Sequence, residues 1–184
     1  MKKIIALLVV VLLAATVLSA KSINTGMDIS ECKDPAVVTF ITYMVGEGIM
    51  DGYFNYYSIG LDDATGQYYV SLTPLGSEYQ SDVVLYFFDE NVEMFWYSDY
   101  YVSDENFLLI LYLINDFTGA YANWATVFID EYYNDCLAST SIMSLAGVEN
   151  YGEAIWSRLE LFIDLSDMGF YDIAQSLAEY LKLN

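Results

Sequence analysis

Carboxylates are the most numerous side chains in this sequence that could do chemistry, because it has 26 acidic residues and no histidine. Without histidine, neither a Ser-His-Asp nor a Cys-His nucleophile can form, and no imidazole metal ligand exists. Two clusters could supply the carboxyl pair of a glycoside hydrolase: Asp89-Glu90-Glu93 and Asp130-Glu131-Asp135. Both lie at the ends of expected strands in a very acidic chain, so solvated turns are the favoured interpretation.

Calcium is the metal that such oxygen ligands would take. Asp62-Asp63 with Asp51 or Glu47 is the candidate set, but the chain has no Asp-x-Asp-x-Asp-Gly loop, which favours a simple turn. The sequence also has no Gly-rich phosphate loop, Cys-x-x-Cys pair or nucleophile elbow. We therefore expect no metal, no cofactor and no catalytic residue.

Aromatic side chains form the remaining candidate site, because the chain has 18 Tyr and 3 Trp residues. The candidates for an aromatic platform that binds sugar or peptide are Trp96, Tyr97, Tyr100, Tyr101, Trp124, Tyr132 and Tyr133. Packing inside the fold is the favoured interpretation of the same residues, because tyrosine-rich strands more often serve packing.

The charge of the chain limits its partners. Six Lys and Arg residues face 26 Asp and Glu residues, which gives a net charge of -20. So few cations argue against a nucleic-acid surface and against a polybasic membrane patch. The hydrophobic fraction of 56% argues against disorder. Cationic partners, divalent ions or salty surroundings suit such a chain, but a solvated acidic face with no specific partner is the favoured interpretation.

The first twenty residues have the three parts of a signal peptide. Met1-Lys2-Lys3 is basic, Ile4 to Leu18 is apolar, and Ser19 and Ala20 are small. We expect residues 1–20 to be cleaved, residues 21–34 to form an arm, and residues 35–184 to form one domain. The protein would then be periplasmic or extracellular, with no membrane attachment, whereas an uncleaved anchor is the alternative. Cleavage removes Lys2 and Lys3, so the mature net charge is -22.

The two cysteines, Cys32 and Cys136, form a candidate disulfide in an exported chain. Two free thiols or an intermolecular bridge are the alternatives. A catalytic cysteine is disfavoured, because no histidine is present to activate it.

Helices and antiparallel strands alternate in the expected order of elements, which defines an α+β fold. Asp34-Pro35 begins a helix that ends at Gly46 and Gly48. Strands follow over 53–57 and 67–72, and then a hairpin over 82–88 and 92–97 whose two faces are both covered. A helix over 103–119 precedes two strands over 124–131 and 136–145. Asn150 caps the long last helix, which Gly169 is expected to kink or divide.

Three stretches resemble the YbjN-like family: Leu113-Ile-Asn-Asp-Phe117, Trp124-Ala-Thr-Val-Phe-Ile-Asp-Glu131 and Leu145-Ala-Gly-Val-Glu-Asn150. That family is described as candidate bacterial sensory-transduction regulators and has the α+β fold of type III secretion chaperones. The resemblance implies a non-enzymatic role in binding a protein or peptide, with a homodimer as one assembly. We therefore expect an exported binding domain. A secreted carboxylate-based glycosidase and a sugar-binding module that uses surface tyrosines are the alternatives.

Overall fold

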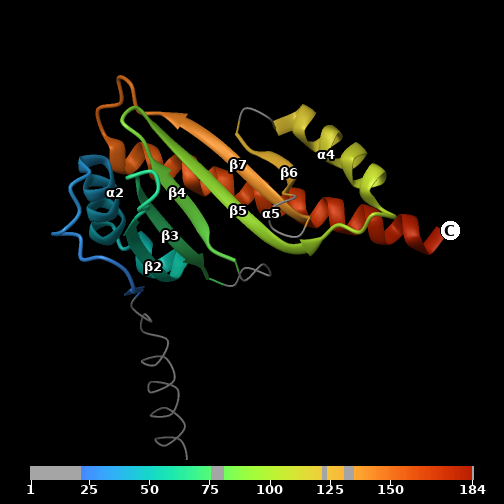
Figure 1. Cartoon of the computed structure of the whole chain (residues 1–184), viewed down its shortest axis with the longest axis horizontal. Helices are drawn as coiled ribbons and strands as arrows, with labels where there is room; N and C mark the ends of the chain where they lie inside the picture. The colour runs from blue at the N-terminus through green and yellow to red at the C-terminus, as the bar shows by residue number, and fades with distance from the viewer. Residues whose placement is uncertain (1–21, 76–80, 122–123, 131–134, 184) are drawn as a thin grey trace, which may run out of the picture.

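One seven-stranded sheet and a long C-terminal helix dominate the computed structural model, which describes residues 22–75, 81–121, 124–130 and 135–183 (Figure 1). The elements in chain order are β1 (Ile23–Asn24), α2 (Pro35–Gly46), α3 (Ile49–Tyr53), β2 (Phe54–Leu61), β3 (Tyr68–Pro74), β4 (Val83–Phe87), β5 (Asn91–Tyr101), α4 (Phe107–Tyr121), β6 (Thr126–Asp130), β7 (Cys136–Ser144) and α5 (Tyr151–Leu183). The expected signal segment, 1–20, lies outside the described residues.

The sheet is antiparallel except at one edge. Its strand order is β1-β2-β3-β4-β5-β7-β6, and only the two-residue β1 runs parallel to its neighbour, β2. β7 pairs with β5 although α4 and β6 lie between them in the chain. The predicted α+β fold, with a helix before the strands and a long helix at the end, is confirmed.

The helices cover one face of this sheet. α5 crosses behind the strands in Figure 1, α2 lies at one end of it, and α4 packs on α5 beyond β6. Side chains in β4 and β5 alternate between buried and more exposed positions, as one covered face requires. The prediction that both faces of the β4–β5 hairpin are covered was therefore wrong. Within the described ranges, no helix has the length and hydropathy that a membrane span needs.

Local chemistry explains where the first and last helices begin. The Asp34 carboxylate accepts hydrogen bonds from the N–H groups of Ala36 and Val37, at 2.8 and 3.1 Å, and so caps α2. α2 ends at Gly46, and Gly48 follows with a φ of 71°. At the start of α5, Asn150 and Glu153 hydrogen-bond to each other in both directions. These predicted helix ends are confirmed.

Two glycines of α5 mark close approaches between helices. α5 runs unbroken through Gly169, so the predicted kink or division was wrong. A Cβ on Gly169 would lie 2.7 Å from Cζ of Phe117, which shows that α4 packs tightly there. A Cβ on Gly152 would lie 2.8 Å from Cγ of Tyr43 and closer still to its Cβ. Glycine at both positions therefore serves packing.

The ends of α4 differ from the prediction. The helix begins at Phe107, because the residues from Ser103 to Asn106 form a turn in which the Asn106 N–H donates to the Ser103 carbonyl at 3.0 Å. Gly119 does not stop the helix, which continues to Tyr121. The short helix α3 and the edge strand β1 were not predicted.

The predicted Cys32–Cys136 disulfide is absent, and both thiols are free and buried. Lys33 follows Cys32 in the chain, and its backbone N–H donates a hydrogen bond to the hydroxyl of Tyr68. Strand pairing places Tyr68 in the same row across the sheet as Met143 of β7. Cys136 lies seven residues before Met143, or about 23 Å along an extended strand. A disulfide needs Cα atoms within about 7 Å, so the fold keeps the two cysteines apart.

Candidate functional site

The face of the sheet that carries no helix is the candidate binding surface, which we call the open face. Strand pairing assigns its side chains. Gly60, Tyr69, Tyr86, Glu93 and Ile142 form one row across the sheet. The next row contains Ser58, Ser71, Val84, Phe95, Thr140 and Thr126. Such rows bring residues from five or six strands onto one surface.

An aromatic patch, defined here as Tyr69, Tyr86, Phe95 and Tyr97, lies on the open face. The ring centroids of Tyr69 and Tyr86 are 6.0 Å apart, and those of Tyr86 and Phe95 are also 6.0 Å apart, with the latter pair edge-to-face. All four side chains remain partly exposed. The patch therefore combines fixed rings with accessible surface, a combination that suits recognition.

Gly60 helps to hold the edge of this patch. A Cβ at that position would collide with the Tyr69 ring, so the ring lies directly over the glycine. An aromatic ring over a strand glycine shields the backbone and fixes the orientation of the ring.

Polar groups border the aromatic patch. The Asp82 carboxylate accepts 2.6 Å hydrogen bonds from the hydroxyls of Ser71 and Thr73. Glu93 lies in the same row as Tyr86, and none of the described strands contains Lys or Arg. The open face is thus aromatic and acidic, without a basic side chain from its own strands.

Trp96 does not belong to a surface platform. Only 1% of its surface is exposed, its ring packs 5.8 Å from that of Phe170 in α5, and its indole N–H donates to the Ser81 carbonyl at 3.2 Å. Tyr97, the next residue of β5, is on the open face. Adjacent strand residues point to opposite faces, so these two candidates could not share one surface.

The other predicted aromatic residues are dispersed. Tyr100 packs against the core, where burial raises the pKa of its hydroxyl, whereas Tyr101 is 62% exposed. The Trp124 ring lies 4.7 Å from the Arg158 guanidinium, whose pKa is lowered by burial. Tyr132 and Tyr133 lie outside the described residues. Among the described members of the predicted set, only Tyr97 is placed in the aromatic patch.

Tyr69, Tyr86 and Phe95 were missed by sequence reasoning, although a signal for one strand was available. Glu93 is a charged residue within β5 and would point away from an apolar core. A period of two then places Phe95 and Tyr97 on the same side as Glu93, and Trp96 on the opposite side. Which β3 and β4 residues share that face depends on strand register, which periodicity alone does not define.

Two of the acidic candidates for calcium, Asp62 and Asp51, are engaged in hydrogen bonds that stabilise the fold. The Asp62 carboxylate accepts from the Ala64 N–H at 2.8 Å, and this hydrogen bond is the main cause that lowers the pKa of Asp62. Asp51 accepts from the Ser22 N–H at 2.7 Å. In the part of the chain that the structure describes, no three Cys, Asp or Glu side chains are grouped so that they could hold a metal ion.

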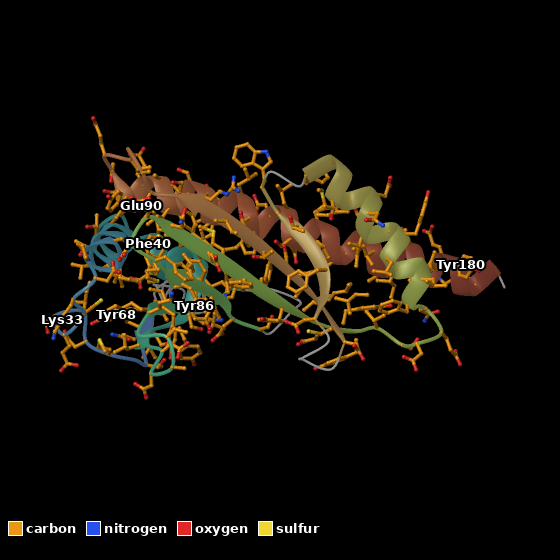
Figure 2. All side chains as sticks on the ribbon, turned by 45° about the horizontal axis from the view of Figure 1, so that its top comes forward. Lys33, Phe40, Tyr68, Tyr86, Glu90 and Tyr180 are labelled. Carbon is orange, nitrogen blue, oxygen red and sulfur yellow. The ribbon has the colours of Figure 1, made fainter. Side chains whose placement is uncertain are left out.

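Part of one glycosidase cluster lies at a cavity. Asp89 and Glu90 line a space of about 770 Å³ together with Asp34, Lys33 and Tyr68. Figure 2 shows Lys33, Tyr68 and Glu90 at the same end of the molecule, near α2. Of these lining residues, Asp34 is already engaged, because its carboxylate caps α2. In the second cluster, Asp130 and Asp135 lie around the start of β7, and Glu131 is outside the described residues.

An antiparallel sheet with helices on one face and a long C-terminal helix places the chain in the α+β class, with the fold described above. Within this class, the chain is similar to the crystal structure of YbjN from E. coli, a protein described as a candidate transcription regulator. The TM-score is 0.51, the sequences are 11% identical, and the match covers 79% of this chain and 94% of YbjN. This likeness shows a YbjN-like fold. No family model matches the chain, and no curated protein does.

Proposed function

We propose that this chain is an exported, non-enzymatic domain that binds a protein or peptide on the open face of its sheet. The aromatic patch on a face without helices supports the proposal. Aromatic side chains are enriched in protein interfaces, where they supply large contact areas at low entropic cost. A partner that covers Tyr86 and Phe95 would bury apolar surface that the fold itself leaves partly exposed.

The regulatory role stated for YbjN would, in this chain, act through a protein partner. Contact with nucleic acid depends largely on Lys and Arg residues that neutralise phosphates. The mature chain has four such residues against 26 acids, and the strands of the described sheet have none. The partner that best suits this surface is therefore a polypeptide.

Crosslinking from the patch tests this proposal. A photoreactive phenylalanine analogue replaces Tyr86 in the protein expressed in its native cells, and the control carries the analogue at Val45, which is 52% exposed on α2. We expect irradiation to give a discrete adduct from position 86 and none from position 45, with the partner identified by mass spectrometry. Identical adducts from both positions, or none from position 86, would contradict binding on the open face.

Export is tested separately by sequencing the N-terminus of the protein from native cells. The basic start and apolar run predict a first residue of Ala20 or Lys21. An intact Met1 in a cytosolic fraction would show that the segment is not a cleaved signal.

A secreted glycosidase remains the alternative function, and the cavity near α2 is the observation that favours it. Tyr68, Asp89 and Glu90 meet there, as an aromatic ring and two carboxyl groups that a sugar site could use. Hydrolysis of a polysaccharide that is lost in both Asp89→Asn and Glu90→Gln would support the enzyme and contradict the binding-only proposal. The homodimer implied by the resemblance also remains a prediction, which analytical ultracentrifugation tests.

A further inference from the structure

A groove of about 440 Å³ lies between α4 and α5, on the helical side of the molecule. The two helices approach closely at Phe117 and Gly169, and residues that follow Gly169 in α5 form one wall of the groove. Figure 1 shows α4 running beside the C-terminal half of α5, past the end of the strands. All its lining residues come from these two helices and none from a strand, so the groove is separate from the aromatic patch.

The floor of this α4–α5 groove is apolar. Leu113 and Tyr121 of α4 line it and are half-buried, while Phe117 and Ile173 are buried beneath them. The ring centroids of Phe117 and Tyr121 lie 5.0 Å apart, so these two rings pack against each other in the floor of the groove. The half-buried Leu113 and Tyr121 therefore present a narrow apolar stripe between polar residues.

The rims of the groove are acidic. Asp116 on α4 and Asp172 and Glu179 on α5 line it and are exposed, and the lining contains no Lys or Arg. Asp172 and Glu179 are seven residues apart, so they lie on one side of α5, two turns or about 10 Å from each other. A ligand that fits must therefore carry positive charges at both sides of an apolar stripe, over at least two turns.

We propose that the α4–α5 groove binds a basic amphipathic helix of a partner protein. Such a helix lays its apolar stripe on Leu113 and Tyr121 and directs Lys or Arg side chains toward Asp116, Asp172 and Glu179, the helix-in-groove mode of recognition. A second copy of this chain cannot supply such a helix, because the four cations of the mature chain, Lys21, Lys33, Arg158 and Lys182, are scattered singly along it. The proposal is independent of the function assigned to the open face.

A labelled model peptide tests the groove directly. The probe is a helical peptide of Leu, Ala and Lys with Leu at i, i+3 and i+7, and its binding to the whole protein is followed by fluorescence anisotropy. We expect saturable binding that weakens as sodium chloride is raised. A peptide with Glu in place of Lys, and one with a central Pro, should not bind. Absence of saturable binding at low salt, or equal binding of the Glu or Pro peptide, would overturn the proposal.

One pair of single variants and one double variant show where the peptide binds. Ser176→Trp fills the groove from an exposed position of its lining and should abolish binding, whereas Ser157→Trp, exposed elsewhere on α5, should not. Asp172→Asn with Glu179→Gln should weaken binding about five- to tenfold, as expected for two exposed charge pairs. Circular dichroism establishes that each variant is folded.

A control double variant with the same change in net charge tests whether the peptide binds the groove or responds only to the acidity of the whole protein. Glu149→Gln with Asp164→Asn removes the same two charges from exposed positions outside the groove, and it should leave the affinity within twofold. Equal weakening by this control would show that the peptide responds only to net charge and would overturn the proposal. A dimer that dissociates in Ser176→Trp would show that a second copy of the chain occupies the groove, and this result would also overturn the proposal. Crosslinking from Tyr86 should be unchanged in every groove variant, so the two proposals fail separately.

Discussion

Replacement of Gly152 by alanine should destabilise the protein, although alanine is the better helix former. Alanine gains at most about 1 kcal/mol of helix propensity over glycine. The new Cβ would lie 2.8 Å from Cγ of Tyr43 and 3.3 Å from the Thr39 carbonyl oxygen. Ordinary carbon contacts are about 3.5–4.0 Å long, so α2 and α5 must separate by about 1 Å. Overpacking of this kind costs about 1–3 kcal/mol, and more where a backbone must move.

The expected net result is a free energy of unfolding lower by about 1–2 kcal/mol, which corresponds to a melting temperature about 2–8 °C lower. Urea unfolding followed by circular dichroism measures the free energy. Gly119→Ala is the matched control, since nothing lies within 4 Å of a Cβ there. That variant should gain up to about 1 kcal/mol. If both variants stabilise the protein, the inferred close packing of α2 on α5 is wrong.

Four further predictions concern stability and thiol chemistry. Asp34→Ala removes the cap of α2 and should lower the free energy of unfolding by about 1 kcal/mol in urea titrations. Thiol titration should find two free cysteines in urea and slow reaction in the native protein, because burial raises the pKa of both Cys32 and Cys136. Ser166→Ala should lower the free energy of unfolding by about 1–3 kcal/mol, because the buried Ser139 hydroxyl loses its hydrogen-bond partner at 2.8 Å. The double variant Ser139→Ala with Ser166→Ala should lose less free energy per substitution, because it leaves no hydroxyl unpaired. Sodium chloride should raise the melting temperature by screening the acidic surface, with equal effects of calcium and magnesium at matched ionic strength; a saturable, calcium-selective rise would instead reveal a site.

Features that depend on neighbouring residues were predictable from the sequence. The Asp34-Pro35 start of α2, the turn from Asp62 to Gly66, and the Asn150 cap of α5 each rest on side chains that hydrogen-bond within a few positions. The edge strand β1 depends on distant contacts, since Ile23 and Asn24 pair with Tyr56 and Tyr57 of β2. Gly169 was misread because glycine both ends helices and permits close approach, and only the position of Phe117 distinguishes the two.

The candidate site was less accessible to sequence reasoning than the fold. An aromatic run such as Trp96-Tyr97 contains one core residue and one surface residue, and the covered face is decided by where α2 and α5 pack. The alternation set by Glu93 could have separated them within β5. The cysteine pairing failed for a related reason: an even number of cysteines says nothing about the distance between Cys32 and Cys136 in the fold.

The position of α5 in the chain order affects how this protein is made. α5 supplies Ile155, Leu159, Phe162 and Phe170 to the core, yet it is synthesised after every strand that it covers. Until those residues leave the ribosome, the part of the inner sheet face that α5 covers stays exposed, so the nascent chain cannot complete its core. A stop codon before α5 would accordingly release a chain whose apolar sheet face is partly uncovered, a substrate for proteases and chaperones.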